Sequence, residues 1–173
     1  MKKKAKKSER AYIRRAQESD INQICELRTE TLKNVNGVSP ATEAGRIAIR
    51  GNNRERFLKK MVEMDTFCLV EDTGEGEQIL GTIDIRDYKT GYAYVISGVF
   101  VRCDQLRNGY GTVMMNFIEK YAVKKGAKAI RLSSTHYARE FYLSRGYQPM
   151  GNPEFSLTMQ KTLERAGERQ HVS

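Results

Sequence analysis

The spacing of hydrophobic residues along the chain changes between a period of two and a period near 3.6, which predicts strands interleaved with helices. The predicted strands are Tyr12–Arg15, Thr66–Glu71, Ile79–Tyr88, Tyr92–Val101, Ala129–Ser133 and Phe155–Met159. The predicted helices are one capped by Ser19-Asp20 with an apolar stripe from Ile21 to Val35, then Glu55–Met64, Thr112–Lys124 and about Thr135–Ser144. This order predicts a single mixed α/β domain.

Between the first two predicted helices, residues 36–53 contain several glycines and a proline but few large apolar side chains apart from Ile47 and Ile49. This composition predicts a long loop or a broken helix. Loops of this length are often binding loops or mobile covers. The segment is therefore a candidate for substrate recognition.

The centre of the chain predicts a hairpin that leads into a parallel crossover. Residues 89–91 form the predicted turn between the strands 79–88 and 92–101. The helix 112–124 follows, closed by Gly126 as a left-handed cap, and then the strand 129–133. Such a unit favours a right-handed crossover, which places the connecting loop at the carboxyl end of its strand, where α/β folds bind ligands.

That connecting loop runs over residues 99–112 and reads Val-Phe-Val-Arg-Cys-Asp-Gln-Leu-Arg-Asn-Gly-Tyr-Gly-Thr. Gly109 and Gly111 let the backbone turn and approach a ligand closely. The first N–H groups of the following helix have no acceptor within the helix, and together with the positive end of the helix dipole they suit a phosphate. The loop therefore predicts an anion-binding site.

The net charge of +9 is concentrated at the N-terminus, where five lysines stand within the first seven residues. This run predicts a disordered basic tail over residues 1–10, which could also contact polyanions weakly and without sequence specificity. Residues 163–173 predict a second, polar tail. The folded domain is therefore expected at residues 11–162.

No apolar run reaches the roughly 18 residues that a membrane helix needs, and no apolar signal stretch follows the charged start. The three cysteines lack Cys-x-x-Cys spacing, which predicts free thiols. His136 and His171 are too few for a metal centre. We therefore expect a cytoplasmic protein, monomer or homodimer, without a membrane or metal partner.

Three blocks of sequence, in order along the chain, resemble the GNAT family, the Gcn5-related N-acetyltransferases. Tyr-Ile-Arg-Arg-Ala with the helix to Arg28 is similar to the family's first strand and helix, and residues 101–111 resemble its acetyl-CoA loop. Ala138-Arg-Glu-Phe-Tyr142-Leu-Ser-Arg-Gly146-Tyr147 is similar to the family segment Ala-x-x-Phe-Tyr-x-x-x-Gly-Phe. The chain departs from the family pattern at Leu106, where Arg or Gln is usual, at Arg107, where glycine is common, and at Thr135, where Asn is common.

The resemblance implies the GNAT fold, a mostly antiparallel mixed sheet of six or seven strands with about four helices, and acetyl-CoA in the splay between two parallel strands. It implies direct transfer of an acetyl group from acetyl-CoA to a primary amine in a ternary complex. Tyr142 takes the position of the general acid that protonates the departing thiolate. The cofactor-binding residues that the resemblance implies are Val99, Phe100, Val101, Arg107, Asn108, Gly109, Tyr110, Gly111, Thr112 and Thr135.

The general base is not identified in this way. Some family members use a strand Glu where this chain has Val95, and the same strand face offers no other carboxylate. An alkylammonium of pKa near 10.4 is only about one part in 2,500 neutral at pH 7, so the amine needs a route to lose its proton. The remaining candidates are Asp84, Asp87, Glu43, His136 and a water chain past Tyr92 or Tyr94.

Three functions therefore stay open. The first is an acetyl-CoA-dependent N-acetyltransferase. The second is a non-catalytic acyl-CoA-binding sensor or partner subunit of the same fold, suggested by the missing strand carboxylate and by Leu106. The third is a protein whose lysine tail docks on RNA while it acetylates a basic protein. The acceptor itself, whether small amine, antibiotic, peptide or protein, is not fixed by the sequence.

Overall fold

The structure, a computed structural model, describes residues 11–88, 91–152, 154 and 156–163. Within these residues, seven strands form one sheet in the order β1-β2-β3-β4-β5-β7-β6. The strands are β1 (Ala11–Arg15), β2 (Asp65–Asp72), β3 (Glu77–Asp87), β4 (Ala93–Val101), β5 (Ala129–Ser133), β6 (Gln148–Pro149) and β7 (Thr158–Thr162). Strands β4 and β5 are parallel and all other neighbours are antiparallel, as expected for this mixed sheet.

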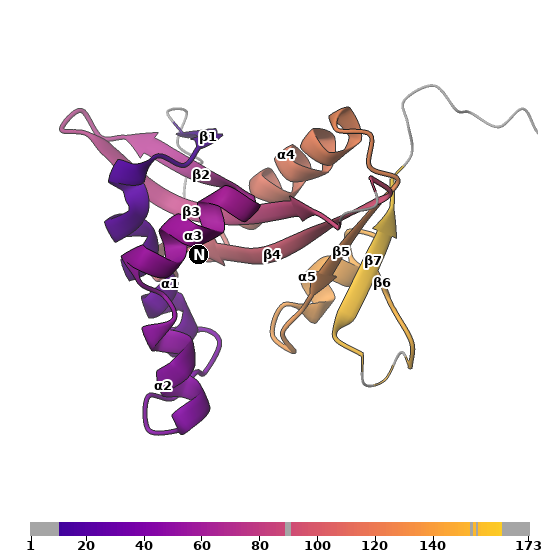
Figure 1. The fold of residues 1–173 in the computed structure, drawn as a ribbon, viewed down its shortest axis with the longest axis horizontal. Coiled ribbons are helices and arrows are strands. Elements are labelled where there is room, and N and C mark those ends of the chain that lie inside the picture. The colour runs from indigo at the N-terminus through magenta and orange to yellow at the C-terminus, as the bar shows by residue number, and fades with distance from the viewer. Residues whose placement is uncertain (1–10, 89–90, 153, 155, 164–173) are drawn as a thin grey trace, which may run out of the picture.

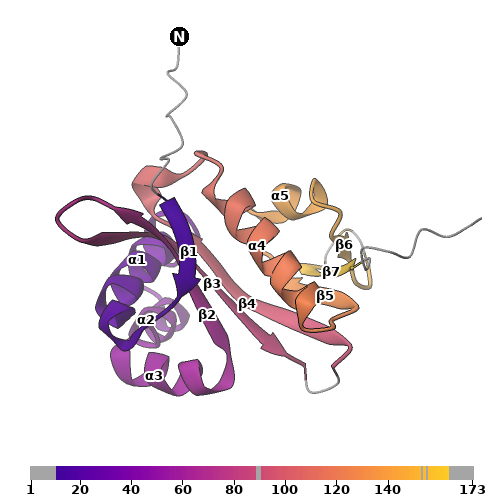
Figure 2. The ribbon, with the colours of Figure 1, turned by 90° about the horizontal axis from the view of Figure 1, so that it is seen from above.

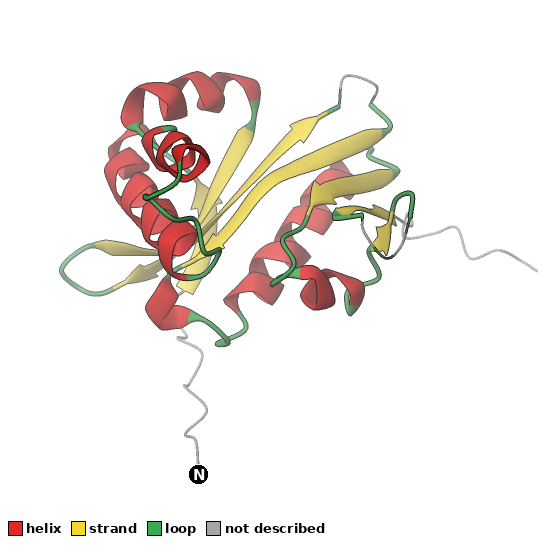
Figure 3. Cartoon of the chain, turned by 90° about the horizontal axis from the view of Figure 1, so that it is seen from below, coloured by secondary structure: helices red, strands yellow, loops and turns green. Residues whose placement is uncertain are grey.

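Helices cover both faces of the sheet (Figures 1, 2 and 3). The α-helices are α1 (Ile21–Asn34), α2 (Glu43–Arg50), α3 (Arg54–Glu63), α4 (Tyr110–Lys124) and α5 (Arg139–Leu143). Helices α1 and α3 bury one face of β2 and β3 through Ile24, Leu27 and Phe57, while Met114, Met115 and Ile118 of α4 fill the larger core on the other face. None of the helices in the described part of the chain is long and apolar enough to cross a membrane.

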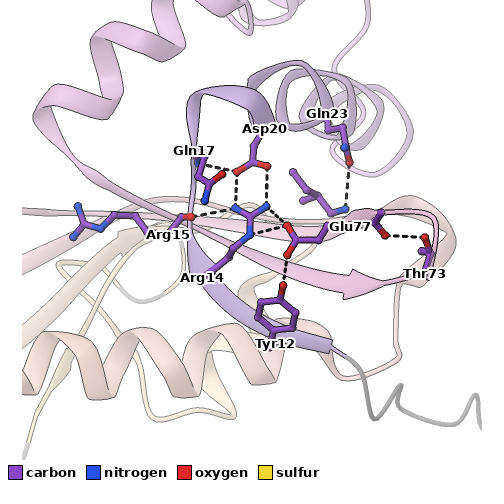
Figure 4. Close-up of polar contacts among 10 residues, drawn as sticks. Tyr12, Arg14, Arg15, Gln17, Asp20, Gln23, Thr73 and Glu77 are labelled. Carbon is purple, nitrogen blue, oxygen red and sulfur yellow. Dashed lines mark hydrogen bonds and ion pairs between the residues drawn. The ribbon is translucent and has the colours of Figure 1, made fainter.

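The first strand is fixed to the sheet by a polar cluster around Arg14 (Figure 4). Its guanidinium donates to both carboxylate oxygens of Asp20, at 2.7 and 2.9 Å, and also to Glu77, which accepts a further hydrogen bond from Tyr12. Burial favours the neutral form of Asp20, but the hydrogen bonds from Arg14 and from the N–H of Gln17 outweigh it and lower the pKa of this carboxyl. The cluster joins β1, the turn before α1 and the start of β3.

Several elements differ from their predicted positions or bounds. Asp20 does not cap α1 with its side chain, because its carboxylate is taken by Arg14 and Gln17. The final strand lies at Thr158–Thr162 rather than Phe155–Met159, and the last helix covers Arg139–Leu143 only. The short strand β6 is not predicted at all.

Other predictions are confirmed. The parallel pair β4–β5 is joined by α4, and Gly126 takes the expected left-handed conformation. The segment 36–53 contains a short helix, α2, whose N-cap Thr42 accepts from the N–H of Gly45. The predicted turn residues 89 and 90, the N-terminal tail, Phe155 and residues 164–173 lie outside the described residues.

Candidate active site

The two parallel strands β4 and β5 are paired along only part of their length. Their register runs from Ala93 and Ala129 to Ile96 and Leu132, after which β4 continues to Val101 without a partner on this edge. The separation begins at a β-bulge in β4, because Ile96 and Gly98 pair with adjacent residues of β3 and leave Ser97 between them. Figure 1 shows β5 and β7 running at a clear angle to β4. The second half of β4 therefore borders an opening in the sheet.

A cavity of about 610 Å³ occupies this opening. One wall is the separated half of β4, and the loop before α4 forms its end. The opposite wall comes from the end of β5 and from α5. The residues that line the cavity are Thr31, Val35, Asn36, Ser97–Val101, Gln105–Arg107, Gly109–Thr112, Ser133, Thr135, Tyr137, Ala138, Phe141 and Tyr142. All the site residues predicted from sequence are brought together here except Asn108, whose side chain donates to Gln105 instead.

The first turn of α4 points its backbone into this region. Gly109 is the N-cap, in left-handed conformation with φ of 82°, and its carbonyl accepts the helix's first hydrogen bond from the N–H of Val113. The N–H groups of Tyr110, Gly111 and Thr112 therefore have no acceptor within the helix. Arg107 is also left-handed, with φ of 63°, a conformation that favours glycine. The loop thus presents backbone donors at the positive end of a 15-residue helix.

Tyr142 lies on α5 and is 7% exposed, yet it contributes to the cavity wall. Its ring packs edge to face against Phe141 and Tyr147, with centroids 5.2 and 5.8 Å away. Burial raises the pKa of Tyr142 to about 12, although nearby Arg145 opposes this rise. The phenol therefore stays protonated at neutral pH.

A buried ion pair supports β4 from the face that α1 covers. Arg28 and Asp84 are 3% and 2% exposed, and the guanidinium donates to Asp84 at 2.8 Å and to Thr82 at 3.1 Å. Thr66 donates to the same oxygen of Asp84 at 2.8 Å. The guanidinium carbon of Arg28 also lies 5.0 Å from the ring centroid of Phe100. Hydrogen bonds from two elements thus hold Asp84 in place beneath the bulge.

The proposed bases are not in the cavity wall. Val95, at the position where some relatives carry Glu, pairs with Arg86 and Arg131 in the closed part of the sheet. Among the described residues that line the cavity, none is aspartate, glutamate or histidine. Asp84, Asp87, Glu43 and His136 all lie elsewhere.

Sequence reasoning missed two parts of the wall. Thr31 of α1 and Val35, just after the helix, line the wall, and Thr31 donates to the carbonyl of Val101 at 3.2 Å, which joins the helix to β4. Asn36, which lines the same wall, begins the segment that the sequence predicts as a candidate for substrate recognition. Ser97 is the residue of the bulge. The spacing 21, 24, 28, 31 puts Arg28 and Thr31 on the apolar stripe of α1, a signal that could have identified both as buried.

The site thus combines diverging parallel strands that enclose a cavity, a helix N-terminus at one end and a protonated tyrosine in the wall. The family model of the GNAT acetyltransferases matches residues 11–147. The chain therefore belongs to the GNAT family of acetyl-CoA-dependent N-acetyltransferases. No protein of curated function matches the sequence.

Solved structures share the fold. The PaiA N-acetyltransferase of Thermoplasma acidophilum in complex with coenzyme A has a TM-score of 0.74 at 17% identity, over 88% of this chain and 98% of that one. Ard1 of Thermoplasma volcanium has a TM-score of 0.66 at 15% identity, over 90% and 99%. An aminoglycoside 6'-N-acetyltransferase complexed with coenzyme A has a TM-score of 0.64 at 16% identity, over 89% and 98%. At these identities the likeness shows the fold and leaves the acceptor open.

Proposed function

We propose that this protein transfers the acetyl group of acetyl-CoA to a primary amine by direct attack while both substrates are bound. The observation that carries the proposal is a single cavity lined by the first turn of α4, by the unpaired half of β4 and by Tyr142. These three features supply an anion site, a backbone edge and a proton donor. A direct transfer needs all of them within reach of one bound donor.

In this proposal the backbone holds most of acetyl-CoA. The N–H groups of Tyr110, Gly111 and Thr112 bind the pyrophosphate, and the guanidinium of Arg107 adds a charge-assisted contact. Asn108 belongs to the same loop, and its side chain helps to shape that loop through Gln105. The backbone of Val99, Phe100 and Val101 pairs with the amides of the pantetheine arm, and Thr135 borders the arm from the opposite wall.

The chemistry then needs two proton movements. The amine nitrogen attacks the thioester carbonyl carbon, the carbon–sulfur bond breaks, and the nitrogen loses one proton. Tyr142 gives its hydroxyl proton to the departing thiolate and recovers one that the nitrogen releases, so that a neutral amine and a thioester become an amide and a thiol. Backbone N–H groups at the bulge of β4 stabilise the charge that develops on the carbonyl oxygen.

The experiment that tests the proposal separates an enzyme from a non-catalytic acyl-CoA sensor. Calorimetric titration with acetyl-CoA measures binding, and release of free thiol in the presence of an amine panel measures turnover. We expect binding together with amine-dependent thiol release. Binding without turnover on any class of amine would favour the sensor.

We also propose that the protein works in the cytoplasm. Cys25, Cys68 and Cys103 are free thiols, which persist in a reducing compartment. Burial raises the pKa of the Cys68 thiol to about 12, which makes this side chain unreactive. Fractionation of cells that express the tagged protein tests the assignment.

A further inference from the structure

The described residues that line the cavity include no carboxylate and no imidazole that would bind or deprotonate an ammonium ion. Among the described residues that line it, the titratable side chains are Arg107, Tyr110, Tyr137 and Tyr142, and the others are uncharged. The single formal charge in that set is the cation of Arg107, which is proposed to contact the pyrophosphate of acetyl-CoA. An ammonium that left water for this cavity would lose its hydration and gain no ionic partner.

The carboxylate of Asp84 lies near the bulge, because Asp84 pairs with Gly98 across the sheet, and one of its oxygens is engaged by hydrogen bonds. One of its oxygens accepts from Arg28 and Thr66, both at 2.8 Å, and the other lies 3.6 Å from the position that a Cβ on Gly98 would occupy. The ring of Phe100 covers Gly98 on the same face, 2.6 Å from that position. Asp84 therefore stabilises β4 from below and does not reach the cavity.

We infer that the acceptor enters as a neutral amine and that its class is the α-amine of a peptide or amino-acid amide. This inference rests on the proposed acetyl transfer and narrows its acceptor. The neighbouring carbonyl lowers the pKa of such an amine to about 8, against about 10.4 for a lysine side chain. At pH 7 the neutral fraction is then roughly 200- to 400-fold larger for the α-amine.

The uncharged polar groups of the wall fit the rest of such a substrate. Asn36, Ser97, Ser133 and Thr135 offer donors and acceptors without charge, which match the amide groups of a peptide. A polycation would find no counter-charge in the described lining. The half-exposed ring of Tyr137 adds an apolar surface at 58% exposure.

Two acceptors of similar size test the inference with the full chain and acetyl-CoA. Alanyl-glycine amide carries a free α-amine, whereas lysine blocked at both its amino and carboxyl ends carries only the side-chain amine. At pH 7 we expect kcat/KM to be at least 100-fold higher for alanyl-glycine amide. As the pH rises from 7 to 9, kcat/KM for blocked lysine should rise about tenfold per unit, while that for the peptide amide levels off above about pH 8.

A designed carboxylate sharpens the test. Asn36→Asp places a negative charge in the wall, which favours blocked lysine. We therefore expect the ratio of kcat/KM for alanyl-glycine amide to that for blocked lysine to fall at least threefold. Asn34→Asp, an exposed change at the end of the same helix, should leave the preference unchanged. Equal turnover of both acceptors, or an unchanged preference in Asn36→Asp, overturns the inference while the acetyl transfer itself stands. Loss of thiol release with every amine contradicts the proposed function instead.

Discussion

The two edges of β4 are built differently. Towards β3 the strand is paired from Tyr94 to Val101 with only the bulge at Ser97 interrupting, and buried polar side chains reinforce that edge from below. Towards β5 it is paired only as far as Ile96. Backbone groups left unpaired in the interior are costly, so a strand can keep one edge open only if the other edge holds it firmly and a ligand or water satisfies the open one. The contrast teaches that stability and binding are divided between the two edges of one strand.

The largest effect is expected from a change on the closed edge. Asp84→Asn removes the charge that balances the buried guanidinium of Arg28, which should lower the free energy of unfolding by about 3–5 kcal/mol. Urea unfolding measures this loss. Asp87→Asn, at the exposed end of the same strand, is the control and should change stability by less than about 0.5 kcal/mol. Similar losses in both variants would show that the ion pair does not hold this edge.

On the open side, the loop at the end of the cavity should be sensitive to its backbone conformation. Gly109→Val introduces a β-branched residue at φ of 82° and distorts the first turn of α4, so we expect the Kd for acetyl-CoA to rise at least tenfold, about 1.4 kcal/mol. Gly126→Val at the other end of α4, with φ of 89° and open space around it, introduces comparable strain away from the cavity. Calorimetry should show unchanged acetyl-CoA binding for this control. Equal weakening in both variants would point to general destabilisation.

Elements that depend on local sequence could be predicted, whereas features that depend on contacts between segments could not. Strands β3 and β4, helix α4 and its glycine loop follow from local periodicity and from residues with restricted conformations, and they lie where the sequence places them. The burial of Arg28 depends on contacts between segments more than 50 residues apart, those of Arg28 with Thr82 and Asp84. The bulge at Ser97 depends on the exact register of β3 against β4, which the alternation of apolar residues does not specify. A single sequence carries little signal of such contacts.

The C-terminal strands show the same limit. Strand β7 pairs with β5 over Thr158–Thr162 and with β6 at Met159 and Gln160, so its bounds lie three residues beyond the predicted Phe155–Met159. The partners that fix these bounds are distant in the sequence or, as β6, were not predicted. For the site, the resemblance to the family predicted ten cofactor-binding residues, nine of which line the cavity. The motifs that carry the resemblance do not include Thr31 and Val35, so it did not predict their place in the wall.

The chemical step itself should respond to Tyr142 alone. Tyr142→Phe keeps the ring and removes the proton donor, so we expect kcat to fall tenfold or more, with the Kd for acetyl-CoA within twofold of the original. Tyr147→Phe is a matched control, since this neighbouring ring is fully buried and its hydroxyl bonds to Glu119 rather than lining the cavity. Because burial raises the pKa of Tyr142 to about 12, the donor should stay protonated up to about pH 10. A steep loss of kcat between pH 8 and 10 would contradict the assignment.

The smallest effect is expected at Arg107, where the side-chain charge favours acetyl-CoA binding while the backbone conformation costs stability. Arg107 holds a left-handed conformation that costs an L-residue roughly 1 kcal/mol, and its charge is proposed to face the phosphates. Arg107→Ala keeps the strain and loses the charge, whereas Arg107→Gly loses both. We therefore expect acetyl-CoA affinity to fall two- to fivefold in each variant, while the thermal midpoint rises only in Arg107→Gly, a difference that calorimetry and a melting scan resolve. If both variants keep their affinity for acetyl-CoA, the Arg107 side chain does not contribute and backbone groups alone bind the donor. The two edges of β4 then differ more clearly: side-chain contacts stabilise the closed edge, and backbone groups bind at the open one.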